Sequence, residues 1–189
     1  MVGFEPRAMP TELHFDLSLY PSPVLRRRAD PIEAFDPGLA EIVAGMFERM
    51  YASKGVGLAA PQVGLRKRIL VLNPTGEKAD EFALINPALV DKFGPQTLFE
   101  EGCLSFPGIY AEIERPESCR VKAFTATGEP LERTFDGFTS RIVQHEYDHL
   151  EGILLVDRMP PAEKLRNKAA LDDLVSRYRR SEEKVRTSP

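Results

Sequence analysis

The stretch QHEYDHLEG at residues 144–152 restricts the fold and chemistry of this chain more than any other. It places His145 and His149 four positions apart, and it holds two of the three histidines of the chain. On a helix, residues four apart lie on one face, about 6 Å apart along the axis, so their imidazoles can converge on one ion. Glu146 can reach a water at such an ion without being a ligand, as in the H-E-x-x-H signature. The stretch predicts a helix that supplies two metal ligands.

The alternative is a surface helix with two chance histidines. It gives His145 and His149 no reason to share a helix with Ile142 and Val143, where a polar group directed inward needs a partner. Catalytic metal sites usually combine three protein ligands with a water. No histidine follows His149, so we expect the third ligand upstream.

The segment EEGCLSFPG at residues 100–108 offers Cys103 as the third ligand. Gly102 allows a tight backbone path, and a thiolate is a strong ligand for Fe(II), Zn or Ni. Alone, Cys103 would more often be a small buried apolar residue. The incomplete histidine pair reverses that preference. Cys119 has no motif around it and is expected to be a structural thiol, and His14 is not expected to be a ligand.

A third informative stretch is GVGLAAPQVG at residues 55–64, whose three glycines and one proline indicate a special backbone. Small residues there would let the backbone approach a substrate closely. The amide of Gln62 can donate a hydrogen bond to developing negative charge. Composition alone favours a tight connection from helix to strand with no chemical role.

Together the three stretches resemble the peptide deformylase family. Its motifs are a G-x-G-[LIM]-A-A-x-Q loop, an E-G-C-L-S segment and a Q-H-E-x-D-H-L-x-G helix. This chain has them, intact and in that order, as GVGLAAPQ (55–62), EGCLS (101–105) and QHEYDHLEG (144–152). The resemblance covers about residues 18–180. The leading arm is longer than expected for the family, and Met9 is an alternative start.

The resemblance implies a metal-dependent hydrolase that removes the N-formyl group from the N-terminal formyl-methionine of newly made polypeptides and releases formate. Cys103, His145 and His149 would bind one divalent ion, expected to be Fe(II), with Zn, Ni or Co able to substitute. Glu146 would be the general base and then the general acid.

The resemblance also implies an oxyanion hole and a substrate pocket. The Gln62 side chain and the Leu104 backbone N–H would form the oxyanion hole, and Gly57 would offer a backbone contact to the substrate. The residues expected by position to line the pocket for the methionine side chain are Val56, Tyr110, Phe138 and Ile142.

Three rival interpretations lead to different functions. A zinc endopeptidase would need a further ligand downstream of the motif, which the chain lacks. A catalytically silent peptide-binding module would not need an intact Glu146. A structural metal site is normally closed by a fourth protein ligand, for which the sequence has no convincing candidate.

Composition limits the partners and the location. A formal net charge of −4 argues against a direct nucleic-acid site. No apolar run approaches the roughly 18 residues of a membrane span, and the acidic leading segment lacks the features of a secretory or transit signal. We expect formyl-methionyl nascent peptides as partners and the bacterial cytoplasm as the location, in preference to an organelle. Ribosome association is expected by analogy alone.

The remaining patterns predict an α+β domain with mostly antiparallel sheets around the central motif helix. We expect an arm at 1–17, one domain at 18–180 and a frayed tail at 181–189. The first helix is expected at 35–55, with Asp36 as its cap, Pro37 in its first turn and Gly55 as a left-handed end. Its expected apolar face comprises Leu39, Ile42, Val43, Met46, Phe47 and Met50.

The other predicted elements follow from apolar periodicity and turn residues. Strands are expected at 68–73 and 82–90, a hairpin at 119–137 around a Thr127–Gly128 turn, and the motif helix at 136–152. A short buried strand is expected at 153–159 and a final helix at 160–185, with Pro161 in its first turn. The expected apolar stripe of that final helix comprises Leu165, Ala169, Leu174, Val175 and Tyr178.

Overall fold

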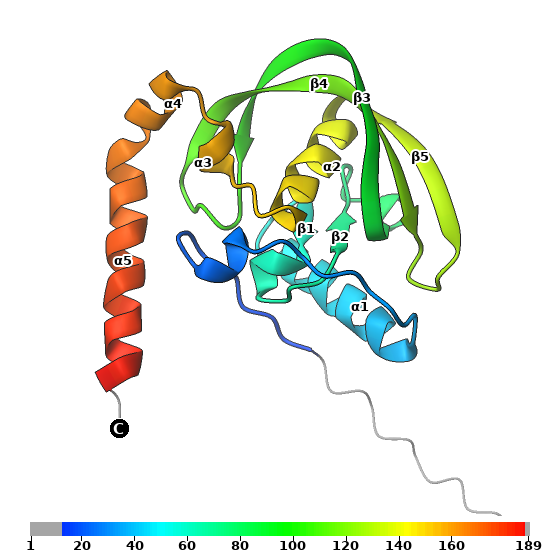
Figure 1. Cartoon of the computed structure of the whole chain (residues 1–189), viewed down its shortest axis with the longest axis horizontal. Helices are drawn as coiled ribbons and strands as arrows, with labels where there is room; N and C mark the ends of the chain where they lie inside the picture. Colours follow the sequence, from blue (N-terminus) through cyan, green and yellow to red (C-terminus); the bar gives the residue numbers. More distant parts are fainter. Residues whose placement is uncertain (1–12, 188–189) are drawn as a thin grey trace, which may run out of the picture.

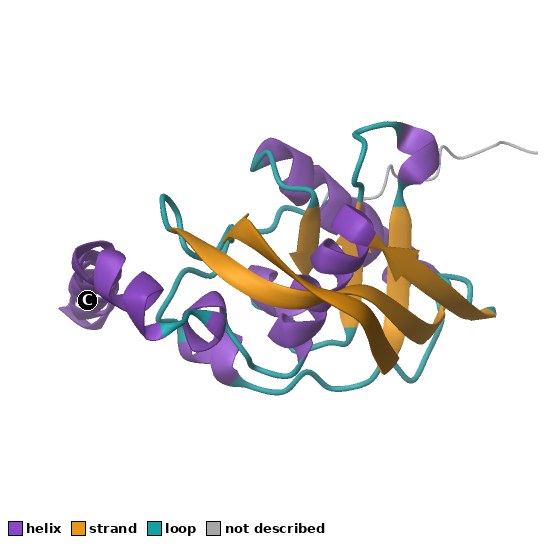
Figure 2. Ribbon diagram, turned by 90° about the horizontal axis from the view of Figure 1, so that it is seen from above, coloured by secondary structure: helices purple, strands orange, loops and turns teal. Residues whose placement is uncertain are grey.

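The computed structural model describes residues 13–187, so the expectations for residues 1–12 and 188–189 lie outside it. A five-stranded antiparallel sheet, in the order β1-β2-β3-β4-β5, curves around helix α2 (Figures 1 and 2). The strands are β1 (Gly57–Ala59), β2 (Ile69–Leu72), β3 (Phe82–Gly102), β4 (Tyr110–Phe124) and β5 (Pro130–Asp136). The helices are α1 (Pro37–Ala52), α2 (Gly137–Leu150), α3 (Leu155–Arg158), α4 (Pro161–Arg166) and α5 (Lys168–Thr187). None of these helices is long and apolar enough to cross a lipid bilayer.

Helix α1 forms as the sequence predicts, except at its end. The Leu39 N–H donates to the Asp36 carboxylate at 3.1 Å, and a proline occupies the first turn. Its apolar face packs against β1 and β2 in a shared core cluster. The expected role of Gly55 is wrong, because Lys54 takes the left-handed conformation with a φ of 57°. Gly55 instead allows a close approach, since a Cβ there would lie 2.7 Å from Leu104 Cδ1.

Strand β3 is much longer than the predicted strand at 82–90. It continues to Gly102 and pairs with β4 as far as Tyr110, with register shifts along the way. Most side chains between residues 90 and 100 are exposed, and the stretch contains Gly94 and Pro95, so it has no strand signal. The added length matters because it brings Glu101 and Cys103 against the histidines of α2.

Both faces of α2 are covered, which explains its many buried polar residues. It ends as predicted at a left-handed Gly152, with a φ of 74°. The predicted hairpin is confirmed, with β4 and β5 joined at a left-handed Gly128.

The segment after α2 differs from expectation. The predicted strand at 153–159 is wrong, because residues Leu155–Arg158 form the one-turn helix α3. The predicted final helix is divided at Asn167 into α4 and α5, with Pro161 in the first turn of α4. Leu165 of the expected stripe is 75% exposed, whereas Leu174 is buried against the domain. Helix α5 continues to Thr187, past the expected domain end at residue 180, and that boundary stays a prediction.

Glycine at position 152 is predicted to be essential to the turn that ends α2. An added Cβ would lie 2.5 Å from the Arg26 carbonyl oxygen, in addition to the left-handed backbone. Gly76 is the matched control, because its φ is 84° and a Cβ there meets nothing within 4 Å. In urea unfolding followed by circular dichroism, Gly76→Ala should lower the free energy of unfolding by about 1 kcal/mol. Gly152→Ala should cost roughly 2 kcal/mol more, and an equal loss in both variants would contradict this.

Candidate metal centre

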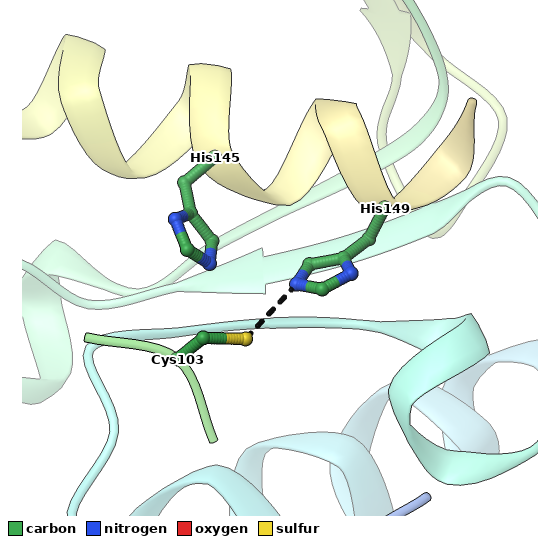
Figure 3. A group of neighbouring side chains, drawn as sticks. All are labelled: Cys103, His145 and His149. Carbon is green, nitrogen blue, oxygen red and sulfur yellow. Dashed lines mark hydrogen bonds between the residues drawn. The ribbon is translucent and has the colours of Figure 1, made fainter. Parts of the chain in front are cut away.

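Two side chains of α2, His145 and His149, converge with Cys103, which follows strand β3. The Cys103 sulfur and one ring nitrogen each of His145 and His149 lie within 4.8 Å of one another, and the sulfur is 3.3 Å from His149 Nε2 (Figure 3). Ligands of one tetrahedral ion with bonds of 2.0–2.3 Å lie roughly 3.5 Å apart, so a small contraction closes the set around an ion. Within residues 13–187, no fourth histidine, cysteine or carboxylate joins this group. The donor set therefore fits a divalent ion with an open position.

The second ring nitrogen of His145 is held by a buried carboxylate. His145 Nδ1 donates to Glu101 Oε2 at 2.9 Å. The carboxylate also accepts two hydrogen bonds from Arg115, at 2.7 and 3.0 Å, and one from Arg141 at 2.8 Å. With Nδ1 donating to Glu101, Nε2 is the nitrogen whose lone pair would bind a metal once the ring is neutral.

The charges around the site favour a bound cation. Burial alone would raise the pKa of Glu101, but the hydrogen bonds from His145 and Arg115 outweigh it and hold that pKa well below its usual value. Burial also lowers the pKa of His145, but Cys103 and Glu101 beside it raise that pKa well above its usual value. Burial and the positive charge of His145 lower the pKa of His149, which favours the neutral imidazole that coordinates metals.

Glu146 is a buried carboxyl that faces the same region. It is 5% exposed, and its Oε2 has no hydrogen-bond partner among the described residues. Burial raises its pKa to about 7. A carboxyl with a pKa near neutrality can both accept and donate a proton under working conditions.

The Gln62 amide is oriented from the glycine-rich loop. Its Oε1 accepts the Ala59 N–H at 2.8 Å, and its Nε2 lies 3.6 Å from the Cys103 sulfur. The loop also needs Gly57, because a Cβ there would lie 2.6 Å from Ile142 Cγ2 and 2.7 Å from Glu146 Oε1. The backbone at Gly57 therefore packs directly against the face of α2 that carries Ile142 and Glu146.

A cavity of about 730 Å³ opens beside these residues. Tyr110, Phe138 and Val56 are 55%, 48% and 41% exposed at its walls, whereas Ile142 is buried. Of the residues expected at the site, those that line the cavity are Val56, Gly57, Cys103, Leu104, Tyr110, Phe138, Ile142, His145 and Glu146. Gln62 and His149 are buried and do not line the cavity. The roles of all these residues stay predictions.

Sequence reasoning missed the charged network that supports the ligands. Arg115 also donates to Asp148 at 2.8 Å, and Arg158 donates to Asp148 at 2.9 Å, so the network joins β3, β4, α2 and α3. Metal-bound histidines usually donate to a second carboxylate or carbonyl. That rule could have pointed to Glu101, which lies inside a motif and accepts from His145. No comparable sequence rule points to Arg115 or Arg141 as supports of the ligands.

The candidate site combines two histidines and one cysteine with an open position and an adjacent carboxyl beside a cavity. This combination defines the class as a mononuclear metallohydrolase. A family model described as polypeptide deformylase matches residues 15–165. Peptide deformylase 1B, chloroplastic/mitochondrial, of Arabidopsis thaliana is 45% identical over 158 residues, which are 80% of this chain and 58% of that protein. Peptide deformylase of Thermotoga maritima is 41% identical over 167 residues, which are 88% of this chain and 99% of that protein.

Solved structures agree with the sequence matches. A crystal structure of peptide deformylase from Plasmodium falciparum superposes with a TM-score of 0.85 at 39% identity, covering 87% of this chain and 97% of that one. The chain spans 58% and 61% of the first two plant relatives. The chain belongs to the polypeptide deformylase family. The α+β fold expected from the sequence is confirmed.

The Glu101 carboxylate is predicted to be essential for metal retention. In Glu101→Gln, His145 loses its anionic acceptor, and Arg115 and Arg141 lose the negative charge that they share in a buried site. We expect metal affinity, measured by chelator competition, to fall about 10–100-fold, and the free energy of unfolding to fall by about 3–5 kcal/mol. The neighbouring Glu100 is exposed, so Glu100→Gln should change neither quantity appreciably. Wild-type metal affinity in Glu101→Gln would contradict the assignment.

Proposed function

We propose that this chain removes the N-formyl group from the N-terminal formyl-methionine of newly made polypeptides and releases formate. Family membership supports the reaction class. The observation that carries the proposal for this chain is the convergence of the Cys103 sulfur with the His145 and His149 rings, beside Glu146 and an open cavity. Formyl-methionyl nascent peptides are therefore the proposed partners.

We propose that Cys103, His145 and His149 hold one Fe(II) ion, with Zn, Ni or Co able to substitute. A thiolate with two neutral imidazoles and an open position is a suitable donor set for these ions. When bound, such an ion supplies Lewis acidity and makes water a nucleophile near neutral pH.

Glu146 moves the protons in the proposed reaction. Its pKa of about 7 in the metal-free site suits a base that accepts a proton from the attacking water and then donates it to the departing amine. Its place opposite Gly57 puts the carboxylate where the loop and α2 meet. The intact carboxyl beside the ligands favours an enzyme over a silent binding module.

Gln62 and the Leu104 backbone N–H are the proposed donors to the developing oxyanion. The hydrogen bond from the Ala59 N–H to Gln62 Oε1 fixes the amide, so that its NH₂ group faces the Cys103 side of the site. A fixed donor needs no reorganisation as charge develops, and one such donor is typically worth about 3 kcal/mol.

The cavity supports binding of an apolar side chain beside an extended peptide. Buried Ile142 and half-exposed Val56, Tyr110 and Phe138 give it mainly apolar walls, which suit methionine. Strand β1, which contains Gly57, is an edge of the sheet, and an extended peptide can pair with such an edge through its backbone.

The rivals have less support. The proposed third ligand, Cys103, lies upstream of the histidines, whereas a zinc endopeptidase would need one downstream. A closed structural site would need a fourth ligand. We propose the bacterial cytoplasm as the location. An organelle is the alternative, because the relatives include chloroplastic as well as bacterial proteins. Ribosome association and the lack of a direct nucleic-acid site stay predictions.

Replacement of the proposed base separates catalysis from binding. Glu146→Gln should release formate from a formyl-methionyl peptide at a rate about 10²–10⁴ times lower, while it retains one metal per chain and its peptide affinity. The control is Glu114→Gln, whose side chain is exposed on β4 and which should be as active as the wild type. Formate release by Glu146→Gln at the wild-type rate would refute the proposed mechanism. So would the absence of formate release from both Glu146→Gln and the wild-type protein.

Oxygen sensitivity tests the metal and its thiolate ligand together. Both Fe(II) and a cysteine thiolate are open to oxidation. We expect air-exposed protein to lose iron and activity relative to an anaerobic preparation, while protein loaded with Ni or Zn keeps its activity in air. Equal iron content and activity in the two iron preparations would contradict this expectation.

A further inference from the structure

Arg141 is a buried arginine that belongs to none of the motifs used to assign the site. It lies one helical turn before His145 on α2, is 7% exposed, and borders the cavity. Alternate residues of a strand share one face, so Thr97, Phe99 and Glu101 of β3 form a row. Arg141 contacts every member of this row.

The guanidinium has two arms with different acceptors. Nη1 donates to Glu101 Oε1 at 2.8 Å and to the Ile113 carbonyl oxygen at 3.0 Å. Nη2 donates to the Thr97 carbonyl oxygen at 2.7 Å and to Thr97 Oγ1 at 2.8 Å. The guanidinium carbon also lies 5.5 Å from the centre of the Phe99 ring.

The two arms lead to different parts of the site. Through Glu101, the Nη1 arm reaches the hydrogen bond that orients His145. The Nη2 arm holds the segment that presents Phe99, whose ring centre lies 6.1 Å from that of Phe138. Phe99 and Phe138 both line the cavity and are about half exposed, so packing alone does not fix them.

We propose that Arg141 is a positioning residue that couples the wall of the substrate cavity to the orientation of the metal ligand His145. The Nη1 arm helps to hold Glu101, and the Nη2 arm fixes the Thr97–Phe99 segment as a binding wall. This inference rests on the proposed function and adds a determinant of substrate affinity to it.

If Arg141 served only to neutralise the charge of Glu101, a lysine at residue 141 could replace it. Arg115 already gives Glu101 two hydrogen bonds, so the charge of Glu101 does not depend on Arg141 alone. Lysine keeps the charge but is a point donor, whereas the planar fork of arginine serves two sets of acceptors at once. Lysine at this position should therefore support only one of the two arms.

The test compares Arg141→Met, Arg141→Lys and Thr97→Val with the wild type. Arg120→Met is the control, because Arg120 lies on β4 with a side chain 47% exposed. The readouts are the rate at which zinc-loaded protein releases zinc to a chelator, and KM and kcat for a formyl-methionyl peptide. NMR of ¹⁵N-histidine in the zinc-loaded protein reports the His145 Nδ1–H.

The arms predict separable effects. Arg141→Met should release zinc about tenfold faster or more, show faster exchange of the His145 Nδ1–H, and have a raised KM. Arg141→Lys should keep near wild-type zinc release with a raised KM. Thr97→Val loses the hydroxyl that accepts from Arg141 and donates to the Arg115 carbonyl oxygen, and it should also raise KM without changing zinc release.

Two results would overturn the inference. One is zinc release from folded Arg141→Met at the rate of the control, and the other is wild-type KM in both Arg141→Lys and Thr97→Val. If Arg141→Met does not fold, Arg141→Lys and Thr97→Val still test whether the Nη2 arm fixes the binding wall. Failure of the proposed function would appear as wild-type protein that releases no formate, whereas failure of this inference leaves an active wild type whose variants match Arg120→Met.

Discussion

The buried carboxylate of Glu101 is the point on which the site depends. It accepts hydrogen bonds from His145, Arg115 and Arg141, which come from α2 and β4. Desolvation of an isolated carboxylate is costly, and here three cationic or polar donors offset it. The same contacts fix the ring of His145 with its proposed metal-binding nitrogen toward Cys103. The Glu101 carboxylate therefore influences both the charge balance of the core and the geometry of the candidate metal centre.

This constraint explains why the sheet is built as it is. Strand β3 must extend to Gly102 to bring Glu101 under α2 and to present Cys103 directly after the strand. The loop that carries Gln62 must then pack closely enough for Gly57 to face Glu146, which only glycine permits. Three motifs far apart in sequence thus form one site because a single helix contacts both the end of β3 and the edge strand β1.

The grouping of His145, His149 and Cys103 was predictable from the sequence, and much of what supports it was not. His145, His149 and Cys103 could be found because metal ligands demand particular residue types and spacing. The extent of β3 could not, because its exposed and irregular residues 90–100 show no alternation and are held by pairing with β4. Arg115 and Arg141 were invisible for a related reason: their contacts are long-range, and an arginine in a sequence is more often exposed. The break between α4 and α5 carried no proline or glycine signal.

The central claim is that one sulfur and two imidazole nitrogens bind the same ion with an open position. X-ray absorption spectroscopy at the iron edge of anaerobically prepared protein, with the iron content of the same sample, tests it directly. The account predicts one iron per chain, with one sulfur ligand, two imidazole nitrogens and oxygen atoms in the remaining positions. It also predicts loss of the sulfur signal in Cys103→Ser. A first shell without sulfur in the wild-type protein would contradict it.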